Sequence, residues 1–156
     1  MSNLRRQITV WGILFLPVLL LCVISCGGSD IDTPREVVIK LFGAMERNDR
    51  PGVEYLLDIP SLMDNTDEDY SLQTEKPRRW HNPDDLLDDM VSDGKTKSRW
   101  FAHQRIIGRT EIRTDSALVE VSFINKTTDT QYYNKFGLHL VEGRWKIYSF
   151  KTLSEL

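Results

Sequence analysis

The feature that most constrains the fold is the alternation of apolar and polar residues in the last third of the chain. Segments rich in branched and aromatic residues follow one another there, at 106–113, 117–126, 131–141 and 144–151. A period of two is typical of strands with one buried face. Glu142-Gly143, between the last two segments, has the composition of a two-residue hairpin turn. The pattern predicts an antiparallel meander in which Trp145 and Ile147 share one face of the last strand.

The segments before these strands have the spacing of amphipathic helices. Thr33-Pro34-Arg35-Glu36 combines a capping threonine, a proline at the first helical position and a glutamate that completes a capping box. We expect this helix to end at residues 48–49. A shorter helix is predicted between Pro51 and Pro60, and a third between its cap, Asn82, and its stop, Gly94. From 59 to 81 the periodicity disappears, so we expect a long irregular loop.

Helices followed by strands predict an α+β fold with the helices on one face of the sheet. The chain has 156 residues, of which 40% are hydrophobic and 10% aromatic, enough for one packed domain. Its formal net charge is -3, and the first 26 residues hold two of the 20 basic residues and none of the 23 acidic ones. The remainder is therefore more acidic still, which excludes nucleic acid as the partner.

The first 26 residues have the organisation of a secretory signal. Arg5 and Arg6 precede an apolar run over 8–24, and small residues close it. Val23-Ile24-Ser25-Cys26 resembles the lipobox of bacterial lipoproteins. In that family the peptide bond before the cysteine is cut, and the cysteine carries the lipid. The resemblance implies that Cys26 is the lipidation site, with a fatty acyl chain such as palmitate as the membrane anchor.

This resemblance divides the chain into a signal peptide over 1–25, the lipidated cysteine and a tether over 26–32, and one α+β domain over 33–156. It implies a location in the cell envelope, facing the periplasm or the exterior. Gly27 stands where an aspartate would retain a lipoprotein at the inner membrane, so we expect the outer membrane if the organism has one. An uncleaved signal anchor is the alternative, because residues 8–25 just reach the length of a membrane span, about 17–25 residues.

Two further segments resemble the nuclear transport factor 2-like superfamily. They are Thr33 to Val38 with Leu41-Phe42, and Glu142 to Ile147 at the closing hairpin. The nearest likeness is to small, uncharacterised domains on bacterial lipoproteins. The resemblance implies a cone, in which a curved antiparallel sheet of cystatin-like type wraps around N-terminal helices and leaves a cavity at its wide end. It also implies a homodimer formed through the sheet.

Relatives of this fold include ketosteroid isomerase, scytalone dehydratase and limonene epoxide hydrolase, which place titratable residues in the cone. The catalytic candidates here are His103, His139 and Tyr133. His139 and Tyr133 stand an even number of residues apart, so one face of a strand can carry both. The alternative is that both are ordinary strand residues. No motif of those enzymes matches residue by residue, so none of their catalytic roles is transferred.

Two stretches, 76–81 and 99–105, combine tryptophan with basic residues. A tryptophan flanked by arginine anchors at a lipid interface, lines a ligand mouth, or packs in the core with solvated neighbours. The expected partner is a small apolar ligand or another envelope protein. The candidates for binding it are Trp80, His81, Trp100 and His103.

The acidic clusters do not predict a metal site. Asp67-Glu68-Asp69 lacks the glycine and the final glutamate of an EF-hand loop. Asp84 and Asp85, close to His81, are explained by their position in the first turn of a helix. We therefore expect no metal and no cofactor, and a binding function without catalysis. A cavity enzyme of the isomerase or hydratase type and a purely structural scaffold are the alternatives.

Overall fold

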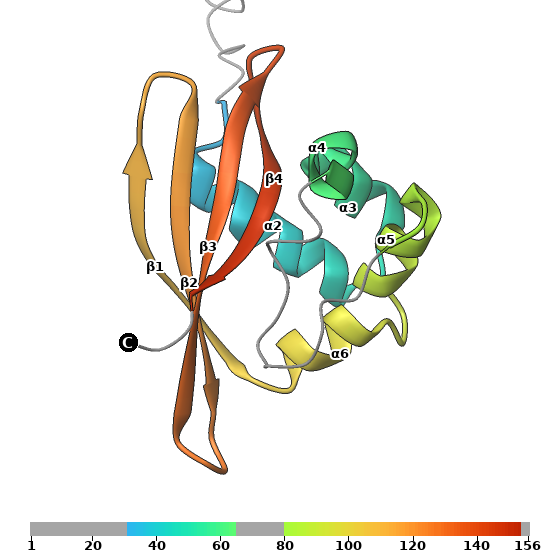
Figure 1. The fold of residues 1–156 in the computed structure, drawn as a ribbon, viewed down its shortest axis with the longest axis vertical. Helices are drawn as coiled ribbons and strands as arrows, with labels where there is room; N and C mark the ends of the chain where they lie inside the picture. The colour runs from blue at the N-terminus through green and yellow to red at the C-terminus, as the bar shows by residue number, and fades with distance from the viewer. Residues whose placement is uncertain (1–30, 65–79, 154–156) are drawn as a thin grey trace, which may run out of the picture. The chain divides into compact units, whose positions relative to one another are not determined.

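Helices occupy the first part of the described chain and strands the second (Figure 1). The computed structural model describes residues 31–64 and 80–153. The helices are α2 (Pro34–Glu46), α3 (Arg50–Leu56), α4 (Ile59–Asp64), α5 (Pro83–Met90) and α6 (Lys95–Phe101). The strands are β1 (Gln104–Ile112), β2 (Ser116–Asn125), β3 (Thr130–Val141) and β4 (Arg144–Leu153). Among the described helices, none combines the length and the apolar composition of a membrane span. The α+β prediction is confirmed.

Helix α2 begins as its sequence predicts. The hydroxyl of Thr33 accepts the backbone N–H of Glu36 at 3.3 Å, and the Glu36 carboxylate accepts the backbone N–H of Thr33 at 2.7 Å. Two N–H groups that a free helix end leaves unpaired are thus satisfied. The helix ends at Glu46, slightly before the expected residues, and Asn48 turns the chain with a φ of 57°.

Helix α4 corrects the prediction that irregular chain begins at residue 59. The side chain of Asp58 caps this helix by accepting the backbone N–H of Ser61 at 3.4 Å and the Ser61 hydroxyl at 2.7 Å. Asp58 is itself held in place, because its backbone N–H donates to the carbonyl of Ile147 in β4 at 2.8 Å. The rest of the predicted loop, residues 65–79, lies outside the described residues.

The sequence predicted that Gly94 ends a helix. In the structure it precedes one. Helix α5 ends at Met90, and Gly94 is the N-cap of α6. The buried carboxylate of Asp89 accepts the first N–H groups of α6, from Lys95 at 3.0 Å and Thr96 at 3.4 Å. A side chain of α5 therefore caps α6.

The strands form one sheet in the order β1-β2-β3-β4, with every neighbouring pair antiparallel. Glu142 and Gly143 form the last turn with φ values of 50° and 76°, as a two-residue hairpin requires. A bulge interrupts β1 between Ile107 and Thr110. The predicted meander is confirmed.

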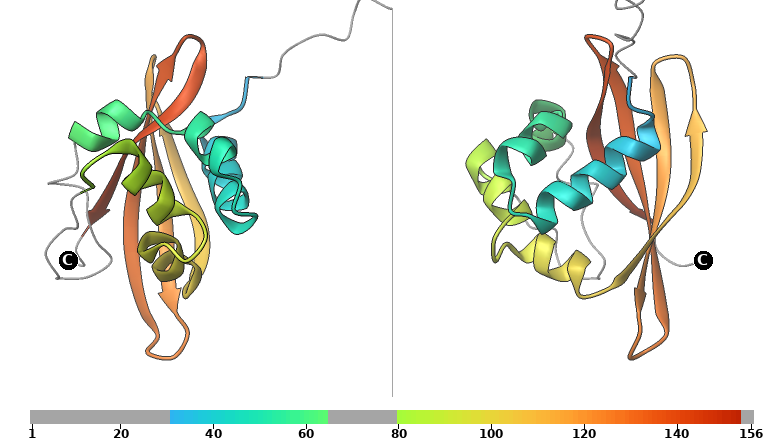
Figure 2. Two further views of the ribbon diagram at one scale, coloured as in Figure 1. Left: turned by 90° about the vertical axis from the view of Figure 1, so that its right-hand side faces the viewer. Right: turned by 180° about the vertical axis from the view of Figure 1, so that it is seen from behind.

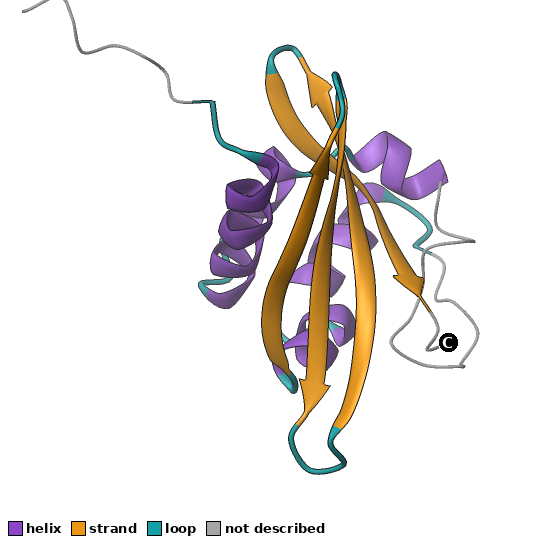
Figure 3. Cartoon of the chain, turned by 90° about the vertical axis from the view of Figure 1, so that its left-hand side faces the viewer, coloured by secondary structure: helices purple, strands orange, loops and turns teal. Residues whose placement is uncertain are grey.

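The helices cover one face of this sheet. Figure 2 (left) shows them in front of the strands, and Figure 3, from the opposite side, shows the strands in front. Side chains of β2 alternate accordingly, with Val119, Val121 and Phe123 buried and Glu120 and Ser122 partly exposed. We call the sheet surface away from the helices the outer face.

The two residues predicted to share one face of β4 differ in burial. Ile147 is fully buried, and Trp145 packs against the core but is only partly buried. Trp145 pairs with Leu140, which is itself exposed, so this level of the sheet lies at the margin of the core.

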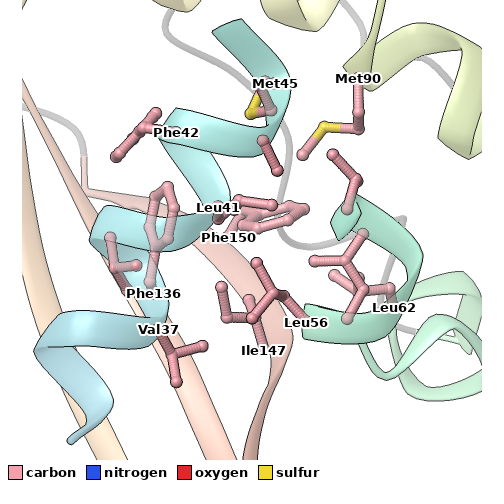
Figure 4. Packing of buried hydrophobic residues seen from close by; sticks show 14 of the residues in the cluster. Val37, Leu41, Phe42, Met45, Leu56, Leu62, Met90, Phe136, Ile147 and Phe150 are labelled. Carbon is pink, nitrogen blue, oxygen red and sulfur yellow. The ribbon is translucent and has the colours of Figure 1, made fainter. Parts of the chain in front are cut away.

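Aromatic side chains fill the space between α2, α6 and the sheet. Phe42 of α2 and Trp100 of α6 lie 5.8 Å apart between ring centroids. Strand residues complete the cluster, since Phe136 and Phe150 lie 5.1 Å apart and Phe123 lies 5.6 Å from Trp100. Figure 4 shows the aliphatic neighbours of this cluster, from Val37 to Met90. A pocket that opens to solvent lies at the border of this cluster.

Candidate ligand pocket

A pocket of about 440 Å³, open to solvent, lies where the junction of α6 and β1 meets the turn between β2 and β3. Figure 1 shows this turn extending beyond α6, at the lower end of the sheet. Its described lining residues come from two segments that are twenty positions apart in the sequence. They supply Phe101, Ala102, His103, Gln104 and Arg105, and then Asn125, Lys126 and Thr127.

Arg105 is the partly buried cation of the pocket. It pairs with Phe123 in the sheet register, on the covered side, although an arginine normally points to solvent. Its guanidinium stacks on Phe101 at 3.8 Å from the ring centroid and lies 5.5 Å from that of Phe42. Burial lowers the pKa of Arg105, and the attraction of Glu46 opposes that effect. The guanidinium nevertheless stays protonated at any physiological pH.

His103 lines the pocket, and one of its two ring nitrogens already forms a hydrogen bond within the protein. Nδ1 lies 2.8 Å from the carbonyl oxygen of Arg99, which only accepts, so Nδ1 carries a proton. The ring also meets Tyr132 edge to face at 5.8 Å. Nε2 is therefore the nitrogen that remains for other contacts.

The turn on the other side of the pocket is held by Asn125. Its side-chain oxygen accepts the backbone N–H groups of Thr127 at 3.0 Å and Thr128 at 3.3 Å. Asn125 and Asp129, which has a φ of 56°, thus shape a turn that holds the exposed Lys126 at the pocket rim.

Comparison with known proteins supports the fold of this chain. No protein-family model and no curated protein matches the chain. Among solved structures, it resembles a designed protein titled Rd1NTF2_05, whose title goes on to give five substitutions. The TM-score is 0.52 at 14% identity, and the match covers 78% of this chain and 97% of that one. The fold is nuclear transport factor 2-like. At this identity the likeness concerns the fold alone.

In this nuclear transport factor 2-like fold, His139 and Tyr133 share a face, as their spacing predicted. That face is the outer one, since the buried side chains of Asn134, Phe136 and Leu138 alternate with them. His139 stacks on Tyr148 at 4.9 Å between ring centroids, and Tyr133 is exposed. Neither lines the pocket, so the structure separates them from His103.

His139 takes part in a hydrogen-bonded group that the sequence did not indicate. Its Nε2 lies 2.6 Å from the Asp58 carboxylate, which also accepts the Ser61 hydroxyl. Burial raises the pKa of Asp58, but the hydrogen bonds from Ser61 and His139 outweigh it and keep the pKa below its usual value. The serine contacts the carboxylate and not the histidine, so this group fastens α4 to the sheet and does not have the order of a catalytic triad.

The tryptophan candidates belong to the core of the nuclear transport factor 2-like fold. Trp80 is 3% exposed and Trp100 is 5% exposed, so both offer little surface to a ligand. The indole N–H of Trp80 donates to Asp89 at 3.1 Å. His81 is exposed before α5, and its backbone N–H donates to Asp85 at 3.1 Å.

Within the described residues, no group of three or more histidine, cysteine, aspartate or glutamate side chains is placed to hold a metal ion. Asp84 forms an ion pair with Arg50, and the carboxylate of Asp85 accepts the backbone N–H of His81, just before α5. The acidic cluster Asp67-Glu68-Asp69 and the lipidation candidate Cys26 lie outside the described residues.

Of the pocket residues that the sequence did not single out as candidates, Arg105 and Lys126 are the charged ones. Arg105 is the last residue of the stretch 99–105, and a ligand mouth was one interpretation of that stretch. Continuing the alternation of β1 backward from Ile107 places Arg105 on the covered face, which is the available signal. Lys126 has no such signal, because only the tertiary fold brings its turn next to α6.

Proposed function

We propose that this is a lipid-anchored cell-envelope protein whose nuclear transport factor 2-like domain binds a small ligand in the pocket between α6, β1 and the β2–β3 turn. The pocket carries the proposal. Its volume of about 440 Å³ lies in the range of small-molecule sites, about 300–1,000 Å³. A catalytic function has less support, because His139 and Tyr133 lie away from the pocket that His103 lines.

The anchor is the second part of the proposal and rests on the lipobox at Val23 to Cys26. In this proposal the signal is removed before Cys26, which carries palmitate or another fatty acyl chain, and the domain faces the periplasm or the exterior. The chain then belongs to the lipoprotein type of nuclear transport factor 2-like domains, placed in the outer membrane if the organism has one.

Cys26→Ala tests the anchor. We expect the variant to remain an uncleaved precursor without label when cells are fed radiolabelled fatty acid, since Cys22, the other cysteine of the chain, precedes the cleavage position. Cys22→Ala is the matched control and should be processed and labelled like the wild type. Equal labelling of the Cys26→Ala protein would refute the anchor, and membrane fractionation of the wild type would locate it.

A variant that fills the pocket tests ligand binding. Ala102 is exposed in the pocket lining, so Ala102→Trp should occupy the pocket with little effect on the core. We expect small molecules found by ligand-observed NMR with the full chain in detergent to lose binding to this variant. Ser98→Trp, on an exposed position of α6 outside the lining, should keep it. Molecules that bind both variants equally would refute the pocket as the site.

A further inference from the structure

We propose that the pocket recognises a carboxylate or phosphate group of its ligand, which Arg105 and Lys126 hold with His103 beside them. This rests on the proposed ligand-binding function and narrows it to a chemical class. A small oxyanion also differs from the small apolar ligand that was expected from the sequence.

Arg105 has hydrogen-bonding capacity that the described protein does not use. A guanidinium carries five N–H donors, and Nη1 of Arg105 makes one long hydrogen bond, 3.5 Å to the carbonyl oxygen of Trp100. Glu46 attracts it electrostatically, yet in the described part of the chain Arg105 forms no ion pair. A partly buried charge without a partner is unfavourable, and an oxyanion in the pocket would satisfy it.

Stacking fixes the direction in which this guanidinium is presented. With Phe101 against one face of the planar group, the remaining N–H donors lie in the plane of the guanidinium, at its edge. Arg105 and Phe101 both line the pocket, so the fork and the ring that supports it border the same space. Planar oxyanions and phosphates are the groups that bind such a fork through two parallel hydrogen bonds.

The charges around the pocket also favour an anionic ligand. Among the described residues, its lining contains Arg105, Lys126 and His103 and no carboxylate, although acidic residues outnumber basic ones in the chain by 23 to 20. Lys126 is exposed and forms no ion pair with the residues that the structure describes. Because Nδ1 of His103 is bound to a backbone carbonyl, protonation would make Nε2 a donor as well.

The experiment compares acetate with acetamide, which has the same shape without the charge, and adds inorganic phosphate as a second anion. Backbone amide shifts of the ¹⁵N-labelled full chain in detergent are followed by NMR at constant ionic strength. We expect saturable shifts at residues 101–105 and 125–127 with acetate or phosphate and not with acetamide. The anion that binds more tightly identifies the group as a carboxylate or a phosphate.

Substitutions assign the interaction to the two cations. Arg105→Gln and Lys126→Gln should each weaken anion binding about tenfold, the loss of one charge-assisted hydrogen bond. Arg109→Gln on the same strand and Lys135→Gln on the outer face, neither in the lining, should bind as the wild type does. Lys126→Gln keeps the test valid if loss of the stacked Arg105 side chain disturbs the fold.

Three outcomes would overturn the inference. Equal shifts with acetamide and acetate would leave a small-ligand pocket that does not select charge, and the proposed function would stand. Equal anion affinity in all four variants would mean general ionic association. Absence of pocket shifts with both anions would refute the oxyanion class, and the proposed function would then depend on the Ala102→Trp comparison.

Discussion

Asp89 is a buried carboxylate surrounded by donors from two directions. The indole N–H of Trp80 reaches it at 3.1 Å and the hydroxyl of Thr96 at 2.6 Å, in addition to the N–H groups of Lys95 and Thr96. It therefore ties the segment before α5 to the start of α6. The Thr33 cap was predictable because its partner is three residues away, whereas the donors to Asp89 come from Trp80 before α5 and from the start of α6, and approach only in the folded chain.

Replacing Asp89 tests this role. Asp89→Ala should lower the free energy of unfolding by about 2–5 kcal/mol, because it leaves the Trp80 and Thr96 donors buried without their acceptor. Asp88→Ala, next to it, removes a carboxylate that is 73% exposed and pairs with Arg50, and should cost less than about 1 kcal/mol. Urea unfolding of the full chain in detergent measures both. A similar loss in the two variants would contradict a structural role for Asp89.

Among the helices and strands, sequence periodicity predicted the long elements and not the short ones. The strands were predicted to within a few residues because alternation over ten or so positions is a local signal. Helices α4 and α6 were missed because they have only 6 and 7 residues, less than two full turns each. The α6 cap, from Asp89, reaches across the turn between α5 and α6, and the Asp58 cap of α4 is local but precedes a helix too short to show a period.

The register of β4 can be tested with two neighbouring residues. Ile147 is fully buried against the helices, so Ile147→Ala should cost about 2–5 kcal/mol. Lys146 points to the opposite face and donates to the carbonyl of Leu57 at 3.4 Å, so Lys146→Ala should cost less than about 1 kcal/mol. Urea unfolding compares the two. If Lys146→Ala proved as damaging as Ile147→Ala, the assignment of faces would be wrong.

For the molecule as a whole, one hydrophobic cluster includes residues of every described helix and of strands β2, β3 and β4. The described residues from Ile31 onward belong to one compact unit around it. The sequence predicted this fold class from the order of its elements. The resemblance implied a cavity, and His103 was a binding candidate, but the residues on the other side of the pocket were not predicted, because the turn at 125–127 and the segment 101–105 meet only when β1 and β2 pair.

A shared cluster predicts a cooperative transition. Helical signal in far-ultraviolet circular dichroism and the fluorescence of the buried tryptophans Trp80 and Trp100 should disappear at the same urea concentration. Removal of the α4 contact to β4 in Asp58→Ala should shift both curves together. Separate midpoints for the two signals would show that the helices and the sheet unfold independently, against a single core.

The hydrogen bonds that fasten the helices to the sheet also affect self-association. At β4, Leu57 forms an isolated parallel bridge with Ile147, and the N–H of Asp58 occupies the Ile147 carbonyl. At β1, the guanidinium of Arg35 occupies the carbonyl of Gly108 within the bulge, at 2.8 Å. Both outermost strands thus have a main-chain acceptor already taken by the helical layer. An incoming strand would have to displace these contacts before pairing along either edge, which protects the protein from edge-to-edge aggregation.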